Sequence, residues 1–167
     1  VYMLRYLPAG DSHGCGLVAI LDGMVAGLKI EGAFINNDLK RRQQGYGRGG
    51  RMSIESDRAE IMSGLRKGET IGSPISILIK NKDFSIDKLP AVTCVRPGHA
   101  DLTGALKYGF NDARSALERS SARETAARTA IGAVCKIFLL KFNIRIKSRI
   151  VMIGGICADS EGDSLIR

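Results

Sequence analysis

The run from Glu118 to Leu140 is the feature that most limits how this chain can fold. Ser121 is followed three residues later by Glu124, the spacing of a capping box, in which each side chain binds the other residue's backbone N–H. Behind this pair, apolar residues recur at helical spacing, which predicts a helix with one face packed on a core. The residues of this apolar stripe are Ala126, Ala130, Ala133, Val134, Ile137 and Phe138.

Two arginines, Arg119 and Arg123, flank the expected start of this helix. The free N–H groups and the dipole of a helix N-terminus already favour an anion, and the arginines add positive charge. One interpretation is therefore a site for a phosphate or an anionic cofactor. The other is an ordinary capped core helix with solvated arginines, and this segment alone leaves both open.

Charge and cysteine content narrow the class of protein. The formal net charge of +8 over 167 residues suggests a polyanionic partner, which could be nucleic acid, an acidic membrane surface or a phosphorylated small molecule. No apolar run approaches the roughly 20 residues that span a bilayer, and the N-terminal residues lack a signal-peptide core. The four cysteines have no metal-ligand spacing, so we expect free thiols in a reducing cytoplasm and no bound metal.

The first fifty residues contain a turn that is a candidate for chemistry. We predict a short strand at 3–7, broken by residues 8–10, and a second strand at 16–22. Between them, His13 lies in a polar turn with glycine on either side, where the backbone can approach a ligand closely. Histidine titrates near neutral pH, so His13 is a candidate acid or base, although a histidine in a loop is often incidental.

Residues 33–44 suit an amphipathic helix, and the Gly/Arg-rich stretch 45–51 that follows predicts a mobile loop presenting arginines. Guanidinium groups bind phosphate and carboxylate oxygens in bidentate fashion. A rival interpretation is an element that contacts RNA, with Tyr46 stacking on a base. A solvated basic loop is the third possibility.

The remaining chain predicts a mixture of strands and helices. Strands are expected at 52–63 and 72–80, with a turn near Lys67–Gly68, and again at 143–155. A helix is expected at 101–108, with Asp101 as its cap fixing the loop that carries His99, the second histidine in a glycine-bearing turn. The pattern indicates a mixed α+β fold, and the placement of histidines and arginines at turns indicates an anion-handling active site.

Five motifs, in order, resemble the N-terminal part of the chorismate synthase family. They are Ala9-Gly10-Asp11-Ser12-His13-Gly14, RRQQGYGRGGRM at 41–52, SGLRKGETIGSPISILIKNKD at 63–83, RPGHAD at 96–101 and ERSSARETAAR at 118–128. The resemblance covers almost the whole chain. It implies that residues 1–167 are the N-terminal part of a single domain with an α+β fold, a β-α-β sandwich in which helices pack between antiparallel sheets, assembled as a homotetramer.

The resemblance also implies an activity. Chorismate synthases eliminate phosphate from 5-enolpyruvylshikimate 3-phosphate in a 1,4-anti sense to give chorismate, and they need reduced FMN although the reaction has no net redox change. In such a scheme the flavin carries the difficult chemistry while the protein orients it. Whether the enzyme reduces its own flavin with NADPH or relies on an external reductase stays open.

Carried over by motif, His13 is the general acid for the departing phosphate and Ser12 a substrate contact beside it, while His99 interacts with the reduced flavin. The arginines implied to bind the substrate's phosphate and carboxylates are Arg42, Arg48, Arg51, Arg96 and Arg123. The implied FMN-binding stretch is Arg119, Ser120 and Ser121, and Arg42 and Arg48 also match positions linked to NADP.

The chain departs from the family pattern in places. Asp11 replaces a usual Glu and shortens the reach by one methylene; Pro8 replaces a usual Thr, and Phe110-Asn111 replaces a more polar pair. The length is about half of a typical member, so we expect the sites here to be incomplete and this chain by itself to be inactive. The alternatives are a nucleic-acid-binding module built on the Arg/Gly loop and an inactive fragment of the enzyme.

Overall fold

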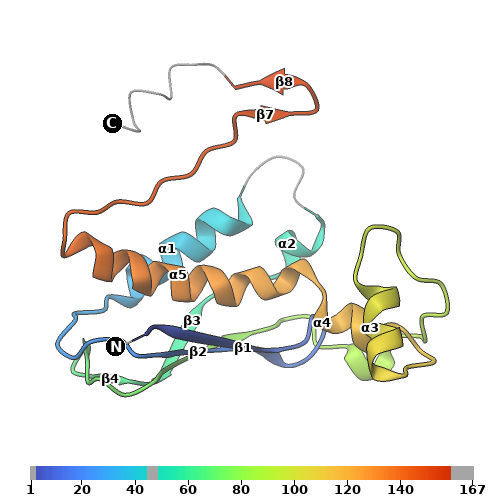
Figure 1. Cartoon of the computed structure of the whole chain (residues 1–167), viewed down its shortest axis with the longest axis horizontal. Helices are drawn as coiled ribbons and strands as arrows, with labels where there is room; N and C mark the ends of the chain where they lie inside the picture. The colour runs from blue at the N-terminus through green and yellow to red at the C-terminus, as the bar shows by residue number, and fades with distance from the viewer. Residues whose placement is uncertain (1–2, 45–48, 159–167) are drawn as a thin grey trace.

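The computed structural model describes residues 3–44 and 49–158. Its centre is a four-stranded antiparallel sheet with the strand order β1-β2-β6-β3 (Figure 1). The strands are β1 (Arg5–Gly10), β2 (Gly16–Asp22), β6 (Ile75–Lys80) and β3 (Ala59–Ser63). The strand predicted at 16–22 is confirmed, and that predicted at 72–80 begins three residues later.

One face of the sheet carries the core. Because side chains alternate along a strand, Leu17, Ala19 and Leu21 of β2 point to the same face as Ile75, Ile77 and Ile79 of β6, and all six are buried. Helices α1 (Gly32–Gln43) and α5 (Thr125–Leu140) lie side by side on this face (Figure 1). Antiparallel strands with helices on one side confirm the α+β class.

Helix α5 bears out the apolar stripe of the Glu118–Leu140 run. Ala126, Ala130, Ala133 and Val134 are buried, and Ile137 and Phe138 pack against the same core. The alanines have small side chains, so the helix approaches the sheet closely. A 3₁₀ turn, η2 (Ala122–Glu124), precedes the helix.

The capping box predicted before α5 is wrong. The Ser121 hydroxyl accepts a hydrogen bond from the Arg123 N–H at 3.2 Å, but the Glu124 carboxylate does not reach back. It accepts instead from the Tyr6 hydroxyl at 3.0 Å and from Arg128 at 2.7 Å. Burial and this hydrogen bond raise the pKa of Tyr6 to about 12. The acid that a local motif assigns to the cap therefore joins the helix to β1.

Two predicted strand boundaries are wrong. Strand β1 continues through Pro8 to Gly10, because β1 is an edge strand and a proline there lacks only an N–H that has no partner strand. Residues 52–54 are not strand but belong to α2 (Arg51–Ile54), and β3 begins only at Ala59. The helical turn brings Arg51 onto Glu55, four residues later, at 3.1 Å.

The turn predicted near Lys67–Gly68 is confirmed. It joins β4 (Leu65–Arg66) to β5 (Glu69–Thr70), and both turn residues have positive φ, 51° and 82°. Two successive positive φ angles give the twist that a two-residue hairpin loop needs.

Two short helices lie at one end of the sheet (Figure 1). They are α3 (Asp101–Tyr108) and α4 (Arg114–Arg119), and a 3₁₀ turn, η1 (Ile86–Lys88), precedes them in the connector. The helix predicted at 101–108 is confirmed, as is the one predicted at 33–44, which begins one residue earlier and ends at Gln43. Asp101 is not the cap of α3: the N-cap is Ala100, and the Asp101 carboxylate binds Arg96 instead.

The strands predicted over 143–155 are mostly absent. Only β7 (Met152–Ile153) pairs, with β8 (Ile156–Cys157), and residues 144–151 have no described strand beside them. Apolar alternation does not make a strand unless another strand accepts its hydrogen bonds. No helix within the described part of the chain combines the length and the apolar character that crossing a membrane requires.

The sheet core allows a direct test of stability. Replacing Ile77, which is fully buried in β6, by Ala removes side-chain contacts between the sheet and α5 and is expected to lower the free energy of unfolding by about 2–5 kcal/mol. Replacing the exposed Ile71 by Ala should change it by less than about 0.5 kcal/mol. Urea unfolding measures both, and equal losses would contradict this assignment of the core.

Candidate active site

Segments far apart in the sequence converge at one end of the sheet. Because the strands are antiparallel, three connecting segments lie at this end: the β1–β2 turn, the chain that follows β6 and the chain that leads into β3. Helix α5 begins at the same end, next to α4 (Figure 1). Ser12 and His13 lie in this turn, as predicted.

The His13 turn is held by an unusual number of hydrogen bonds. The Asn81 side-chain amide donates to the backbone carbonyls of Asp11, Ser12 and Gly14, at 3.2, 3.1 and 2.7 Å. The Asn81 N–H donates to the carbonyl of Cys15, and the His13 carbonyl accepts from the Ile86 N–H, both at 3.0 Å. A turn with this many fixed carbonyls presents its side chains in one orientation.

His13 itself contacts a buried carboxylate of α4. Its Nδ1 lies 2.9 Å from both oxygens of Glu118, and its backbone N–H donates to Glu118 Oε2 at 2.7 Å. The side chain of Glu118 is only 1% exposed, while that of His13 is 22% exposed. The other ring nitrogen, Nε2, lies 3.8 Å from Asp83 Oδ2, and the side chain of Asp83 is 32% exposed.

Arg51 joins this turn to the segment after α2. Its guanidinium donates to the Ser12 hydroxyl at 2.6 Å, to the Ser12 carbonyl and to the Asp83 carbonyl at 3.2 Å. It also pairs with Glu55 at 3.1 Å. Ser12 is buried, and its hydroxyl donates to Ser121 at 3.0 Å.

Arg123 is the most deeply buried cation of the cluster, with a side chain only 2% exposed. Its Nη1 is 2.5 Å from Asp57 Oδ1, and its Nε donates to Asn81 Oδ1 at 2.8 Å. The other oxygen of Asp57 accepts from Arg42 at 3.0 Å. Arg42 also donates to the Thr125 hydroxyl at 3.0 Å, so two arginines clamp one buried carboxylate between α1 and the start of α5.

The pKa of Glu55 shows how this cluster is balanced. Burial by itself raises the pKa of a carboxyl, but Glu55 accepts the Lys82 N–H and lies near Arg123 and Arg51, and its pKa is lowered overall. The described cluster is therefore not a free cationic patch: Arg42, Arg51 and Arg123 are each paired with buried acid.

A pocket of about 670 Å³ lies beside the His13 turn. Arg119 and Ser120 line it from the end of α4, and Asp11 lines it from the turn. Helix α3 and its following loop supply a mostly apolar wall, in which Tyr108 and Phe110 stack with ring centroids 5.6 Å apart. Ser121 turns the other way, toward Ser12. The stretch predicted to bind FMN thus divides between the pocket and the cluster.

Arg96 and His99 lie in the loop before α3. Arg96 forms a two-point ion pair with Asp101, at 2.8 and 2.9 Å, and Asp101 also accepts the Arg96 N–H at 3.1 Å. These contacts lower the pKa of Asp101 to about 2, the hydrogen bond from the Arg96 side chain being the largest cause. His99 is exposed and precedes Ala100, which lines the pocket. The pair with Asp101 fixes the loop, as the cap was expected to do.

The structure brings together six of the residues predicted from the sequence: Ser12, His13, Arg42, Arg51, Ser121 and Arg123. Arg119 and Ser120 lie at the adjacent pocket, and Arg96 and His99 beside it. Arg48 and Tyr46 lie outside the described residues. The substrate and cofactor roles of all these residues stay predictions.

Sequence reasoning missed the acceptors that organise the cluster: Glu55, Asp57, Asn81 and Glu118. The available signal was weak: Glu55 and Asp57 follow the basic loop, and Asn81 and Glu118 lie inside the motifs already quoted. Among the described residues, no group of three or more His, Cys, Asp and Glu could hold a metal ion.

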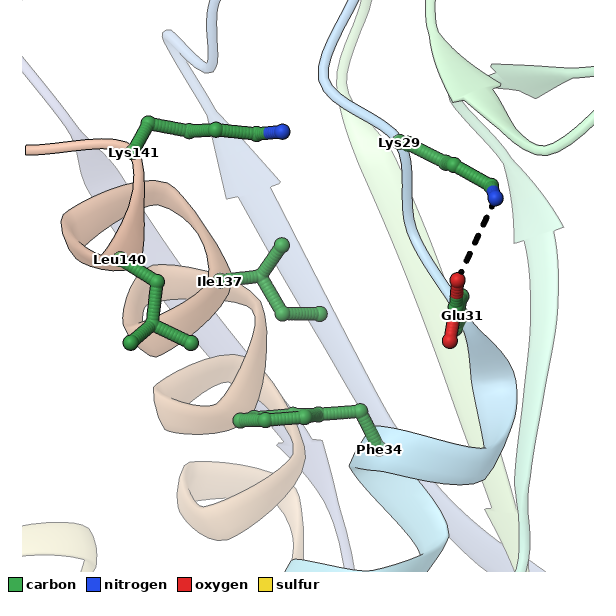
Figure 2. A pocket seen from close by; sticks show the side chains of 6 residues that line it. All are labelled: Lys29, Glu31, Phe34, Ile137, Leu140 and Lys141. Atoms are coloured by element: carbon green, nitrogen blue, oxygen red, sulfur yellow. Dashed lines mark ion pairs between the residues drawn. The ribbon is translucent and has the colours of Figure 1, made fainter. Parts of the chain in front are cut away.

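A smaller pocket of about 270 Å³ lies at the opposite end of the helices (Figure 2). Phe34 of α1 and Ile137 and Leu140 of α5 form its apolar part, and an ion pair between Lys29 and Glu31 at 3.3 Å lies at its rim. Ile137 is twelve residues from the start of α5, which corresponds to about 18 Å of helix. This pocket is therefore separate from the His13 cluster.

Residues 4–166 match the family model described as chorismate synthase. The chain belongs to this family. It is 53% identical over 161 residues to the chorismate synthase of Thermoanaerobacter pseudethanolicus, covering 95% of this chain and 46% of that protein. It is 55% identical over 163 residues to that of Aquifex aeolicus, covering 90% and 41%.

A solved structure gives the same result. A crystal structure of chorismate synthase is 48% identical and has a TM-score of 0.68, with 85% of this chain and 35% of that chain covered. The chain spans about half the length of the curated relatives it matches. The comparisons establish the family and the fold of this part of it.

The buried pair of Arg123 and Asp57 predicts a large and specific loss of stability. Replacing Arg123 by Ala leaves Asp57 with one fewer partner and Glu55 without its buried neighbour, and is expected to lower the free energy of unfolding by about 3–5 kcal/mol. Replacing the exposed Arg128, which pairs with Glu124 on the preceding turn, by Ala should lower the free energy of unfolding by about 0–1 kcal/mol. Similar losses in urea unfolding would show that Arg123 is not a structural cation.

The pair of Arg96 and Asp101 predicts a dependence of stability on pH. The folded pKa of Asp101, about 2, lies below its ordinary value of 3.8, so its stabilisation is complete above about pH 4 and is lost as pH falls toward 2. The Asp101→Asn variant should be less stable at pH 6, and its difference from the unsubstituted chain should shrink between pH 4 and pH 2. Urea unfolding at each pH measures this difference, and a constant gap would contradict the prediction.

Proposed function

We propose that this chain is the N-terminal part of a chorismate synthase that eliminates phosphate from 5-enolpyruvylshikimate 3-phosphate to give chorismate. Two observations together support this proposal. Residues 4–166 match the family, and within them the His13 turn, the arginines and a pocket lie together at one end of the sheet. Residues 1–167 would form part of a single domain, so the whole activity belongs to a longer chain.

His13 would be the general acid for the departing phosphate. Its Nδ1 faces Glu118, so Nε2, which lies 3.8 Å from Asp83 Oδ2, is the nitrogen that would give a proton to a leaving oxygen. Arg51 would fix the turn beneath it by donating to the hydroxyl and the carbonyl of Ser12. The side chain of His13 is 22% exposed, and a substrate would approach the ring from this exposed part.

The pocket beside the turn fits a flavin mononucleotide. Its lining combines the Tyr108 and Phe110 rings with the cationic side chains of Lys107 and Arg119, which suits a planar ring system carrying a phosphate. Ser120 adds a hydroxyl, and His99 lies in the loop before α3, next to Ala100, which lines the pocket. Reduced FMN, when bound, would supply the transient electron density that assists loss of phosphate. The residues of this chain would hold and orient it.

Anionic groups of the substrate or of NADPH would contact Arg42, near the end of α1, and Arg51, the first residue of α2, on either side of the Gly/Arg stretch. Arg42 also lines a pocket of about 270 Å³ with Arg41, Lys136 and Asp38, the acid that pairs with Lys136 at 2.8 Å. Arg96 keeps part of its surface exposed although it pairs with Asp101. Arg123 would act as an internal counter-ion, because it is buried.

By its family we also propose a cytoplasmic homotetramer. The face of the sheet opposite the helices exposes Leu7 and Ile20 from adjacent strands, which leaves apolar surface for another copy or for the rest of the chain. The family match over residues 4–166 includes the Gly/Arg stretch on which the nucleic-acid alternative rests, so that alternative receives no specific support.

The test is anaerobic release of phosphate from 5-enolpyruvylshikimate 3-phosphate with reduced FMN. It compares the chain 1–167 with the longest open reading frame that contains it, called the long form below. We expect activity in the long form alone. Replacing His13 by Ala in the long form should slow release by at least about 100-fold, since a general acid contributes roughly 10²–10⁴. Replacing His99 by Ala should also slow release, because the flavin would lose a contact. Arg66→Ala, on the β4–β5 hairpin, is the control and should keep normal rates.

Each outcome has a distinct meaning. Phosphate release by neither form would contradict the proposed activity. Release by the long form with near-normal rates in both histidine variants would keep the activity and overturn the roles of His13 and His99.

A further inference from the structure

We propose that Glu118 is a positioning residue that keeps the Nδ1 proton on His13 and so directs Nε2 toward the reacting phosphate. This inference rests on the proposed function in one respect only, the use of His13 as the acid. Glu118 belongs to none of the residues predicted from the sequence, although it begins the motif that contains Arg119 and Ser121.

Glu118 holds the His13 turn at three points. Its backbone carbonyl accepts the Ser12 N–H at 3.0 Å, its Oε2 accepts the His13 N–H at 2.7 Å, and both carboxylate oxygens lie 2.9 Å from His13 Nδ1. A single residue of α4 therefore sets the backbone and the ring of the histidine together. A residue needed only to fill the core would not require a carboxylate here.

The contact fixes the tautomer of the ring. A carboxylate has acceptors and no donors, so the nitrogen facing it must be the one that carries a hydrogen. In the neutral ring Nε2 is then the acceptor, and in the protonated ring Nε2 carries the proton that can be given away. The reverse tautomer would place two acceptors 2.9 Å apart inside a buried contact.

The charges around the ring support the same role. Two acids face His13: Glu118 at Nδ1 and Asp83, 3.8 Å from Nε2. Two cations lie close to this arrangement. Arg114 lies 3.6 Å from Glu118, and Arg51 donates a hydrogen bond to the Ser12 carbonyl. The ring is therefore held with Nδ1 against the buried acid and Nε2 on the side of Asp83.

The Glu118→Gln variant tests the tautomer. An amide has one acceptor oxygen, which the His13 N–H would take, and its NH₂ group would then face Nδ1. The ring should respond by moving its proton to Nε2. Nitrogen NMR of the long form labelled in histidine reports the tautomer directly, and His13→Ala identifies the signal.

The same variant tests the consequence for the reaction. We expect kcat for phosphate release to fall about 10- to 100-fold with little change in KM, as is usual when the partner that orients a functional histidine is removed. The control is Asp112→Asn. The Asp112 carboxylate accepts the N–H groups of Val92 and Arg114 at the start of α4, at 2.7 and 2.8 Å, so its loss perturbs the same helix without touching His13. In Asp112→Asn, the tautomer of His13 and the kcat for phosphate release should be those of the unsubstituted protein.

The outcomes separate this inference from the proposed function. An unchanged tautomer in Glu118→Gln, or a changed tautomer with unchanged kcat, would overturn the positioning role. An equal fall of kcat in Asp112→Asn would also overturn it, because the effect would then come from α4 as a structure. Absence of phosphate release in the unsubstituted long form would instead contradict the proposed function, while the NMR measurement would still decide the contact.

Discussion

The rest of the His13 site depends on the contacts that the buried guanidinium of Arg123 makes. It contacts Asp57, from the chain entering β3, and Asn81, from the chain leaving β6, while its own backbone begins the approach to α5. A buried charge needs such partners, because water cannot solvate it. Asn81 in turn holds three carbonyls of the His13 turn. The position of the histidine is therefore linked, contact by contact, to the packing of the longest helix on the sheet.

This linkage separates two uses of arginine that look alike in a sequence. Arg123 is committed to an internal network, and Arg42 and Arg51 pair with buried acids while they stay nearer the surface. Arg119 lines a pocket. An ion pair that holds a guanidinium in one orientation also prepares it to meet an anionic ligand, since less side-chain entropy is lost on binding. The pairs are consistent with a preorganised site as well as with a stable fold.

Local pattern predicted the elements whose stability is mainly local or whose burial is strongly periodic. The apolar stripe of α5, the strand at 16–22 and the hairpin turn at Lys67–Gly68 were all visible, because period and turn chemistry suffice for them. The prediction failed where a neighbour decides: Pro8 is tolerated because β1 is an edge, and residues 144–151 pair with no described strand. Glu124 does not form the predicted capping box, because its carboxylate accepts hydrogen bonds from Tyr6 and Arg128 instead.

The sequence by itself determined the α+β class, the polar turn that carries His13 and the family, whose motifs occur in order along the chain. The tertiary structure decided which charges meet. Glu55, Asp57 and Asn81 are separated from Arg123 by between 42 and 68 residues, and Glu118 from His13 by 105. No periodicity encodes such pairs. They form because antiparallel strands and the start of α5 end at the same place, and because burial there leaves each charge only the partners that the fold supplies.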